Sequence, residues 1–310
     1  MDSPCRTWPA GIHRAIIKVI LRFSITCLEA TLCLYHVIRG TFHVRGYAPD
    51  GDSIRFGAND ENHWGLLAGP PAKLNGRGHA QLRLEAIDTL ETHFQNTHQP
   101  LALARQALDH LMAQLGITEV RWNDQGTMVI AANDGVEGYI ISRQVERNRR
   151  PVAFVFAGVP PEEDGSPVFL DAARVAQSVN AEMLRVGLAY PTYYEGLFFD
   201  LRNSLSAIVA TARAGNKGVW VHDRTNAGFV VDGLQSISND HVILPKLFRR
   251  LAVYLEAGGS VQGFKQHLAE LEESLFIIST AHATHFDTVV EVNDNTVRMT
   301  EPPENLIFKE

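Results

Sequence analysis

The chain has 310 residues, of which 45% are apolar and 20% charged, a composition typical of a globular protein with a sizeable core. Its formal net charge is −7, and the acidic excess is concentrated in residues 223–310. Proteins that hold polyanions through their overall field are usually basic, so this balance argues against tight nonspecific binding of nucleic acid. Any such role must depend on local arginines.

The N-terminal segment, residues 1–39, contains all three cysteines of the chain. Cys5, Cys27 and Cys33 have spacings that match neither a zinc motif nor a disulfide framework. The stretch Ala15–Ile38 is apolar, but charged residues interrupt it too often for a membrane span. It therefore predicts an amphipathic helix without stable membrane insertion. A cytoplasmic location is favoured, and a divergent signal peptide with secretion is the alternative.

Residues 40–223 alternate between strand-like and helix-like patterns. Strands are predicted in "TFHVRGY", "SIRF", "AQLRLEAID", "TMVIAAND" and "PVAFVFAG", with a long loop over residues 57–79. Apolar side chains at three- and four-residue steps predict helices over residues 100–116, 171–187 and 197–215. This order predicts an α+β fold: a five-stranded β-barrel of the oligonucleotide-binding (OB-fold) type with three packed helices.

Residues 224–310 are predicted to form a mostly helical C-terminal extension. The stretch "ILPKLFRRLAVYLEAGG" predicts an amphipathic helix, and "VVEVNDNTVRM" predicts a hairpin. The extension could cap the barrel, mediate self-association or bind a partner, and its residues do not distinguish these roles. His282, His285 and Asp287 lie close together in "HATHFD", but without a further ligand they indicate a surface feature rather than a metal site.

Acidic residues gather at two predicted turns. Asp50 and Asp52 flank Gly51 in "APDGDSIRF", and Asp88 and Glu91 lie three residues apart in "DTLET". Carboxylate oxygens from two strand ends suit a hard cation such as Ca²⁺. Each turn is also explained by the hydrogen bonds that aspartate makes to its own backbone. Taken separately, either turn favours this structural interpretation over a metal site.

Five segments of the sequence, taken in chain order, form a pattern that extends beyond the two acidic turns. They are "DGDSIRF", "LRLEAIDTLET", a helix that opens at "QP", "RNRRPVAFVF" and "SVNAEMLRVGLAY". Together they resemble the signatures of the staphylococcal-nuclease-like (thermonuclease) family over residues 41–223. The resemblance implies a Ca²⁺-dependent nuclease that hydrolyses phosphodiester bonds of DNA or RNA, preferably single-stranded. It also implies Asp52 and Asp88 as carboxylate ligands of Ca²⁺, beside the backbone carbonyl of Thr89.

The resemblance further assigns residues to the substrate. Arg83 and Arg150 would contact the scissile phosphate, and Glu91 would be the general base for the attacking water. Tyr193 or Tyr194 would stack on or bond to the nucleotide, although either is equally explained as a buried tyrosine. A divalent cation and two planar guanidiniums suit the charge that develops on a phosphodiester during hydrolysis.

The sequence also departs from the family. Leu90 stands where the family has proline, and "RNRRP" lacks an aromatic residue that the family has near its second arginine. The alternative function is therefore a catalytically silent OB-fold module that binds nucleic acid or a protein partner, because a fold alone does not prove an activity. Retention of both arginines, both aspartates and the glutamate favours the enzyme.

Overall fold

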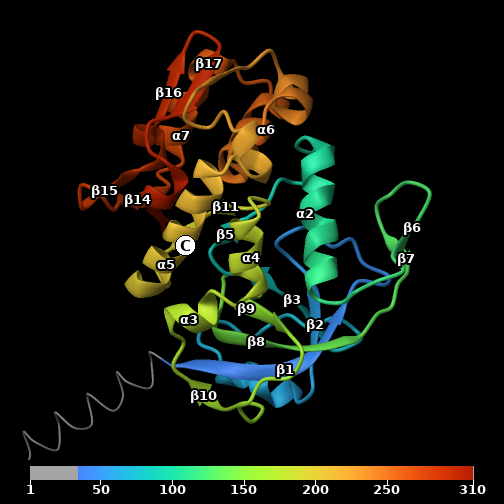
Figure 1. Cartoon of the computed structure of the whole chain (residues 1–310). Helices are drawn as coiled ribbons and strands as arrows, with labels where there is room; N and C mark the ends of the chain where they lie inside the picture. Colours follow the sequence, from blue (N-terminus) through green and yellow to red (C-terminus); the bar gives the residue numbers. More distant parts are fainter. Residues whose placement is uncertain (1–33, 310) are drawn as a thin grey trace, which may run out of the picture.

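A curled sheet forms the base of the molecule in the computed structural model, which describes residues 34–309 (Figure 1). Its strands are β1 (Tyr35–His43), β2 (Arg55–Ala58), β3 (His79–Gln81), β4 (Arg83–Leu84), β8 (Val136–Val145), β9 (Pro151–Ala157) and β10 (Pro167–Val168). The order is β3-β2-β1-β8-β9-β4, with β10 paired to β1. Because β3 and β4 end this order yet only Leu82 separates them in the chain, the sheet must curl until its edges meet. The predicted α+β class is confirmed.

Helices cover one face of this sheet. The predictions over residues 100–116 and 197–215 are confirmed by α2 (Leu101–Gln114) and α5 (Phe199–Ala214). The predicted helix over residues 171–187 is wrong in its continuity, because the chain forms α3 (Ala172–Val175) and α4 (Val179–Arg185) instead. Ser178 separates them, since its side chain accepts a hydrogen bond from the Ala181 amide and so begins a new helix. Helix α4 contacts α2, α5 and β9.

The structure differs from the sequence-based expectation at three further places. Strand β8 was not predicted, and it lies in the middle of the sheet with most of its residues buried. The segment "TMVIAAND" supplies only β7 (Val129–Ala131), which pairs with β6 (Arg121–Trp122) outside the main sheet. The helix over Ala15–Ile38 is wrong for residues 35–38, which begin β1, so the predicted boundary at residues 39 and 40 falls inside a strand. The rest of that helix and the three cysteines lie outside the described residues.

The C-terminal segment, residues 224–309, lies beyond the helices on the side away from the sheet, as the orange and red ribbon of Figure 1 shows. It contains α6 (Pro245–Glu256), α7 (Phe264–Glu270), β13 (Phe229–Val230), β14 (Ser274–Ile277), β15 (His282–His285), β16 (Val290–Asn293), β17 (Thr296–Met299) and β18 (Leu306–Phe308). The predicted helix and hairpin are confirmed as α6 and β16–β17. The histidines of β15 are exposed.

Of two further short pairings, only the second links the C-terminal segment to the residues before it. Strand β5 (Ile87–Asp88) pairs with β11 (Tyr190–Pro191), and β12 (Tyr193–Tyr194) pairs in parallel with β18. The C-terminal segment therefore shares a sheet, β12-β18-β14-β15, with the preceding domain. Among residues 34–309 no helix combines the length and the apolar character needed to cross a membrane.

Asn180 ties α4 to the sheet beneath it. Its side chain is fully buried and accepts a hydrogen bond from the Val155 amide at 2.9 Å. It also donates to the carbonyls of Glu85 at 2.9 Å and Ala153 at 3.0 Å. Because Glu85 and Ala153 lie on or beside the paired strands β4 and β9, this one amide fixes the strand that carries Arg83.

We expect Asn180→Ala to lower the free energy of unfolding by about 3 kcal/mol, because it leaves buried backbone groups without partners. Urea denaturation measures the loss. The matched control is Asn239→Ala, at an exposed position whose side chain bonds only Gln235 in the described structure. A loss no larger than that of the control would contradict the role given to Asn180.

Candidate active site

A cavity of about 480 Å³ lies where the turns at the end of the curled sheet meet α6. Six of the residues predicted from the sequence line it: Asp52, Arg83, Asp88, Glu91, Arg150 and Tyr194. Arg249 of α6 lines it as well, although the sequence did not point to this residue. Segments that are far apart in the chain thus bring acidic and basic side chains to one space.

The turn that carries Asp52 is held against the next turn by its backbone. The Asp52 carbonyl accepts a hydrogen bond from the Leu84 amide at 2.9 Å, beside Arg83. Gly51 permits this close approach, because a Cβ atom there would lie only 2.7 Å from the Thr89 hydroxyl oxygen. Asp50 serves the turn itself by accepting from the Gly51 amide at 2.9 Å, which agrees with its interpretation as a turn residue.

Thr89, whose carbonyl the resemblance implied as a ligand, is buried and does not line the cavity. Its amide donates to the Asp52 carboxylate at 3.3 Å, which ties the turn of Asp88 to the turn of Asp52. Leu90, at the position of the family's proline, is a buried core residue, and apolar packing holds this turn.

Arg249 is the cation that pairs with the carboxylate cluster, which we define as Asp52, Asp88 and Glu91. Its guanidinium donates to both oxygens of Asp88, at 2.9 and 2.8 Å, and to Glu91 at 2.5 Å. The two acidic side chains are only 6% and 14% exposed, so the ion pairs are screened poorly by water. Burial disfavours the charged guanidinium, but the two carboxylates nevertheless hold the pKa of Arg249 well above its usual range.

The cluster carries more negative charge than its neighbours balance. Burial, and then the charges of Asp88 and Glu91, raise the pKa of Asp52 to about 7. Burial also raises the pKa of Glu91 to about 7, although Arg249 opposes the shift. Arg249 therefore offsets burial and the repulsion between these carboxylates only in part, and a further cation would stabilise their charged forms.

The donor set fits a hard cation such as Ca²⁺ in its chemistry, because Asp52 and Asp88 offer carboxylate oxygens in an acidic cavity. In residues 34–309, however, no three or more His, Cys, Asp or Glu side chains are grouped closely enough to hold a metal ion. Arg249 engages both oxygens of Asp88. A metal ion would therefore need Asp88 to share or release this partner.

The two predicted phosphate contacts lie on neighbouring strands. Arg83 begins β4, where it pairs with Val152 of β9, and Arg150 immediately precedes β9. The Arg83 guanidinium lies over the ring of Tyr194, 4.1 Å from its centroid. Arg150 donates from Nε to Glu146 at 3.0 Å, and its side chain is 36% exposed. Both guanidiniums are thus oriented by a neighbour while they line the cavity.

The two predicted tyrosines point in opposite directions. Tyr194 lines the cavity, whereas Tyr193 is fully buried and its hydroxyl lies 2.9 Å from the Ser206 hydroxyl on α5. Consecutive strand residues face opposite sides, which explains the division. Tyr193 is a core residue, and only Tyr194 is available to a ligand of the cavity.

The C-terminal segment also holds the loop that carries Glu91. Gln99 is fully buried, and its side-chain Nε2 donates to the Ile243 carbonyl at 2.8 Å. Its Oε1 accepts a hydrogen bond from the Glu91 amide at 3.3 Å. Thr97 and Ser238 bond through their hydroxyls at 2.7 Å. The segment that the sequence left without a role therefore forms part of the site.

Comparison with known proteins finds no family model and no curated protein that matches the chain.

Replacing Arg249 with methionine keeps an apolar stem but leaves Asp88 and Glu91 without their cation. We expect Arg249→Met to lower the free energy of unfolding by about 3 kcal/mol without divalent cations, because buried carboxylates remain unpaired. Urea denaturation in EDTA measures it. The control Arg298→Met breaks an exposed pair with Glu291 and should cost under about 1 kcal/mol. Equal losses would show that Arg249 does not balance the cluster.

Because the pKa of Asp52 is raised in the folded chain, the free energy of unfolding should decrease as the pH rises. The folded chain keeps this proton up to about pH 7, whereas the unfolded chain releases it near the ordinary value of 3.8. Because the folded state binds more protons between these values, the free energy of unfolding falls as pH rises through this window and stays low above it.

Asp52→Asn removes this contribution. We expect the variant to unfold with a free energy on the order of 1 kcal/mol higher than wild type at about pH 8 in EDTA, and with little difference near pH 4. Denaturation at both pH values measures it, with the exposed Asp124→Asn as control. A variant less stable than wild type at about pH 8 would contradict the conclusion that the carboxylates around Asp52 carry excess negative charge.

Proposed function

We propose that this cavity binds and hydrolyses a phosphodiester of single-stranded DNA or RNA, in a Ca²⁺-dependent reaction on an OB-type barrel. The observation that carries the proposal is the convergence of Arg83, Arg150, Asp52, Asp88 and Glu91 on one cavity. A phosphodiester is an anion that gains charge on its oxygens during hydrolysis, and guanidiniums oriented beforehand stabilise that charge without reorganisation.

Arg83 and Arg150 would hold the scissile phosphate. Planar guanidiniums match phosphate oxygens in pairs, which favours arginine over lysine at such positions. The ring of Tyr194 packs against one face of the Arg83 guanidinium. A smaller pocket of about 130 Å³ continues past Tyr194 and Arg249 and is lined by Arg147, Lys246 and Arg250 among others. Lys246 and Arg250 pair with Glu273 there, so Arg147 is the cation that would meet the next phosphate of a bound strand.

Glu91 would accept the proton of the attacking water. A general base works best when its pKa lies near the working pH, and burial brings the pKa of Glu91 to about 7. Asp52 and Asp88 would hold Ca²⁺, which when bound supplies positive charge to the phosphate oxygens. Water attack on phosphorus would form a new P–O bond and break the bond to the leaving oxygen. The leaving oxygen would take a proton from solvent to become a hydroxyl, and Glu91 would return the proton of the attacking water to solvent.

One observation favours the second candidate, a silent binding module. Arg249 occupies both oxygens of Asp88 and contacts Glu91, so the proposed metal ligand and the proposed base are already paired. A module of this kind would use Arg83 and Arg150 to bind phosphates without cleaving them. Both candidate functions predict that the cavity binds nucleic acid, but only the nuclease predicts that the strand is cleaved.

The deciding assay incubates the full chain with a single-stranded oligonucleotide in Ca²⁺ or in EDTA. We expect cleavage only with Ca²⁺, and a loss of about 100-fold or more in rate for Arg83→Ala and for Glu91→Gln. Arg298→Ala, in an exposed pair of β17, is the control and should cleave as wild type does. Folded wild type without Ca²⁺-dependent cleavage, or variants that cleave equally well, would refute the nuclease and leave the binding module.

A further inference from the structure

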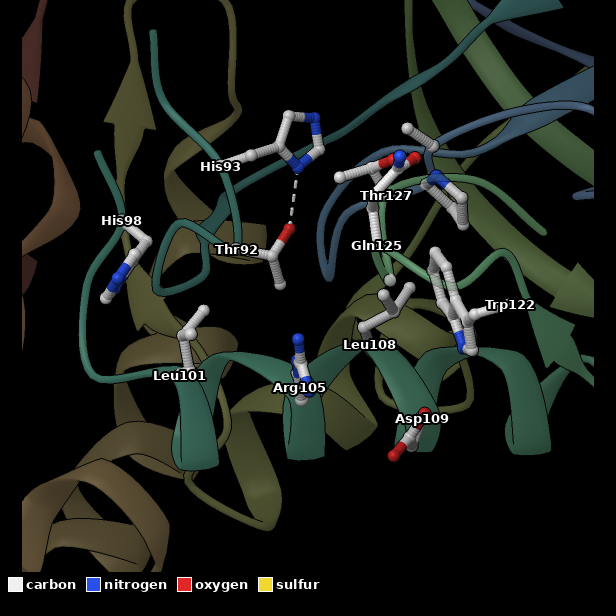
Figure 2. A pocket seen from close by; sticks show the side chains of 13 residues that line it. Thr92, His93, His98, Leu101, Arg105, Leu108, Asp109, Trp122, Gln125 and Thr127 are labelled. Atoms are coloured by element: carbon white, nitrogen blue, oxygen red, sulfur yellow. Dashed lines mark hydrogen bonds between the residues drawn. The ribbon is translucent and has the colours of Figure 1, made fainter. Parts of the chain in front are cut away.

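A second cavity, of about 560 Å³, adjoins the candidate active site (Figure 2). Ala48 and His93 line both cavities, so the two spaces share a wall. The second is bounded by α2 on one side and by residues of the β6–β7 hairpin on the other. Its volume lies within the range of about 300–1,000 Å³ that is usual for pockets holding small organic groups.

The walls of this cavity combine apolar surface with one unpaired cation. Leu101 and Leu108 of α2 and the half-buried ring of Trp122 supply the apolar part. Arg105 points from α2 into the space between the two leucines in Figure 2. Its guanidinium makes no hydrogen bond and no ion pair with any residue in 34–309. Its donors are therefore free for a ligand.

A hydrogen-bond chain connects the two cavities. The Thr92 hydroxyl donates to the Asp50 carboxylate at 3.2 Å, and His93 Nδ1 lies 2.8 Å from the same hydroxyl. Because the hydroxyl has a single hydrogen, it accepts from His93 when it donates to Asp50. Asp50 belongs to the turn that carries Asp52. A group bound beside His93 would thus lie next to the acidic end of the active site.

We propose that this second cavity binds the base of the nucleotide next to the scissile phosphate. The inference rests on the proposed function, because the neighbouring cavity must hold the phosphate for the base to reach this one. A planar base would lie against the Trp122 indole, and Arg105 would donate to acceptors on its edge. Stacking on an aromatic side chain contributes about 1–3 kcal/mol per base. Guanine offers two adjacent acceptors that suit a guanidinium, so it is the preferred base.

Trp122 makes the proposal measurable without cleavage. Of the three tryptophans in residues 34–309, Trp64 and Trp220 are buried, at 6% and 7% exposure, whereas Trp122 is open to the cavity. The full chain is titrated with guanosine 5′-monophosphate while tryptophan fluorescence is recorded, and ribose 5-phosphate serves as the probe without a base. We expect the nucleotide to quench fluorescence, ribose 5-phosphate to leave it unchanged, and Trp122→Phe to lose the quench.

The variant Arg105→Gln tests the polar contact. We expect it to weaken binding of the nucleotide about tenfold, because a pair of hydrogen bonds to the base edge is lost. Arg121→Gln is the matched control, since Arg121 is an exposed neighbour of Trp122 that does not line the cavity. Thermal unfolding of both variants and of Trp122→Phe checks that the fold is kept.

The outcomes separate this inference from the nuclease itself. If the protein cleaves single strands but guanosine 5′-monophosphate does not change its tryptophan fluorescence, the base site is refuted and the nuclease stands. Equal quenching by ribose 5-phosphate, or unchanged affinity in Arg105→Gln, also overturns the base site. Quenching that depends on Trp122 and Arg105 in a chain that does not cleave supports the base site and refutes the catalytic part of the proposed function.

Discussion

The carboxylates gathered at one end of the curled sheet require a cation nearby, and the ion pairs of Arg249 with Asp88 and Glu91 supply one. They join residues 161 and 158 positions apart in the chain. Removal of one member of such a buried set costs more than the pair contributes, because the other charge is left uncompensated. The position of the C-terminal segment and the geometry of the acidic turns therefore depend on each other.

The charges of the cavity are divided between an acidic cluster and two arginines, so an acidic chain can still offer positive charge to an anion. The carboxylates keep a raised pKa because burial and mutual repulsion are only partly offset by Arg249. The cations that could meet a phosphate, Arg83 and Arg150, lie on the adjacent strands of the same cavity. Under the proposed function, attraction for a phosphate would be local and would not require a basic protein. The net negative charge of the chain would oppose strong nonspecific binding, and recognition would depend on these side chains.

The sequence predicted much of the site, because its motifs keep their order. Asp52, Arg83, Asp88, Glu91 and Arg150 come from segments that neighbouring strands and turns bring together, and the structure places them around one cavity. Arg249 could not be predicted in this way. It lies on an amphipathic helix where a charged residue usually faces solvent, and its partners are distant in sequence. The only local signal is that Lys246 and Arg249, one helical turn apart, border the apolar face of α6.

In the fold, too, elements marked by their own sequence pattern were predicted, whereas features set by contacts between distant segments were not. Helices α2 and α5 follow from their own apolar periodicity, whereas β8 is buried on both faces and has no alternation to reveal it. Tyr193 and Tyr194 illustrate the limit for single residues, because only the pairing of β12 decides which ring faces the cavity. What depends on one element was predicted, and what depends on contacts between elements required the structure.

The most direct measurement is a crystal structure of the full chain with Ca²⁺ and a dinucleotide whose linking phosphate carries a sulfur substitution that resists cleavage. The account predicts that this phosphate lies within hydrogen-bond distance of both Arg83 and Arg150, on the side of the cavity that faces Glu91. A phosphate bound elsewhere, with Arg83 still on Tyr194 and Arg150 still on Glu146, would contradict it.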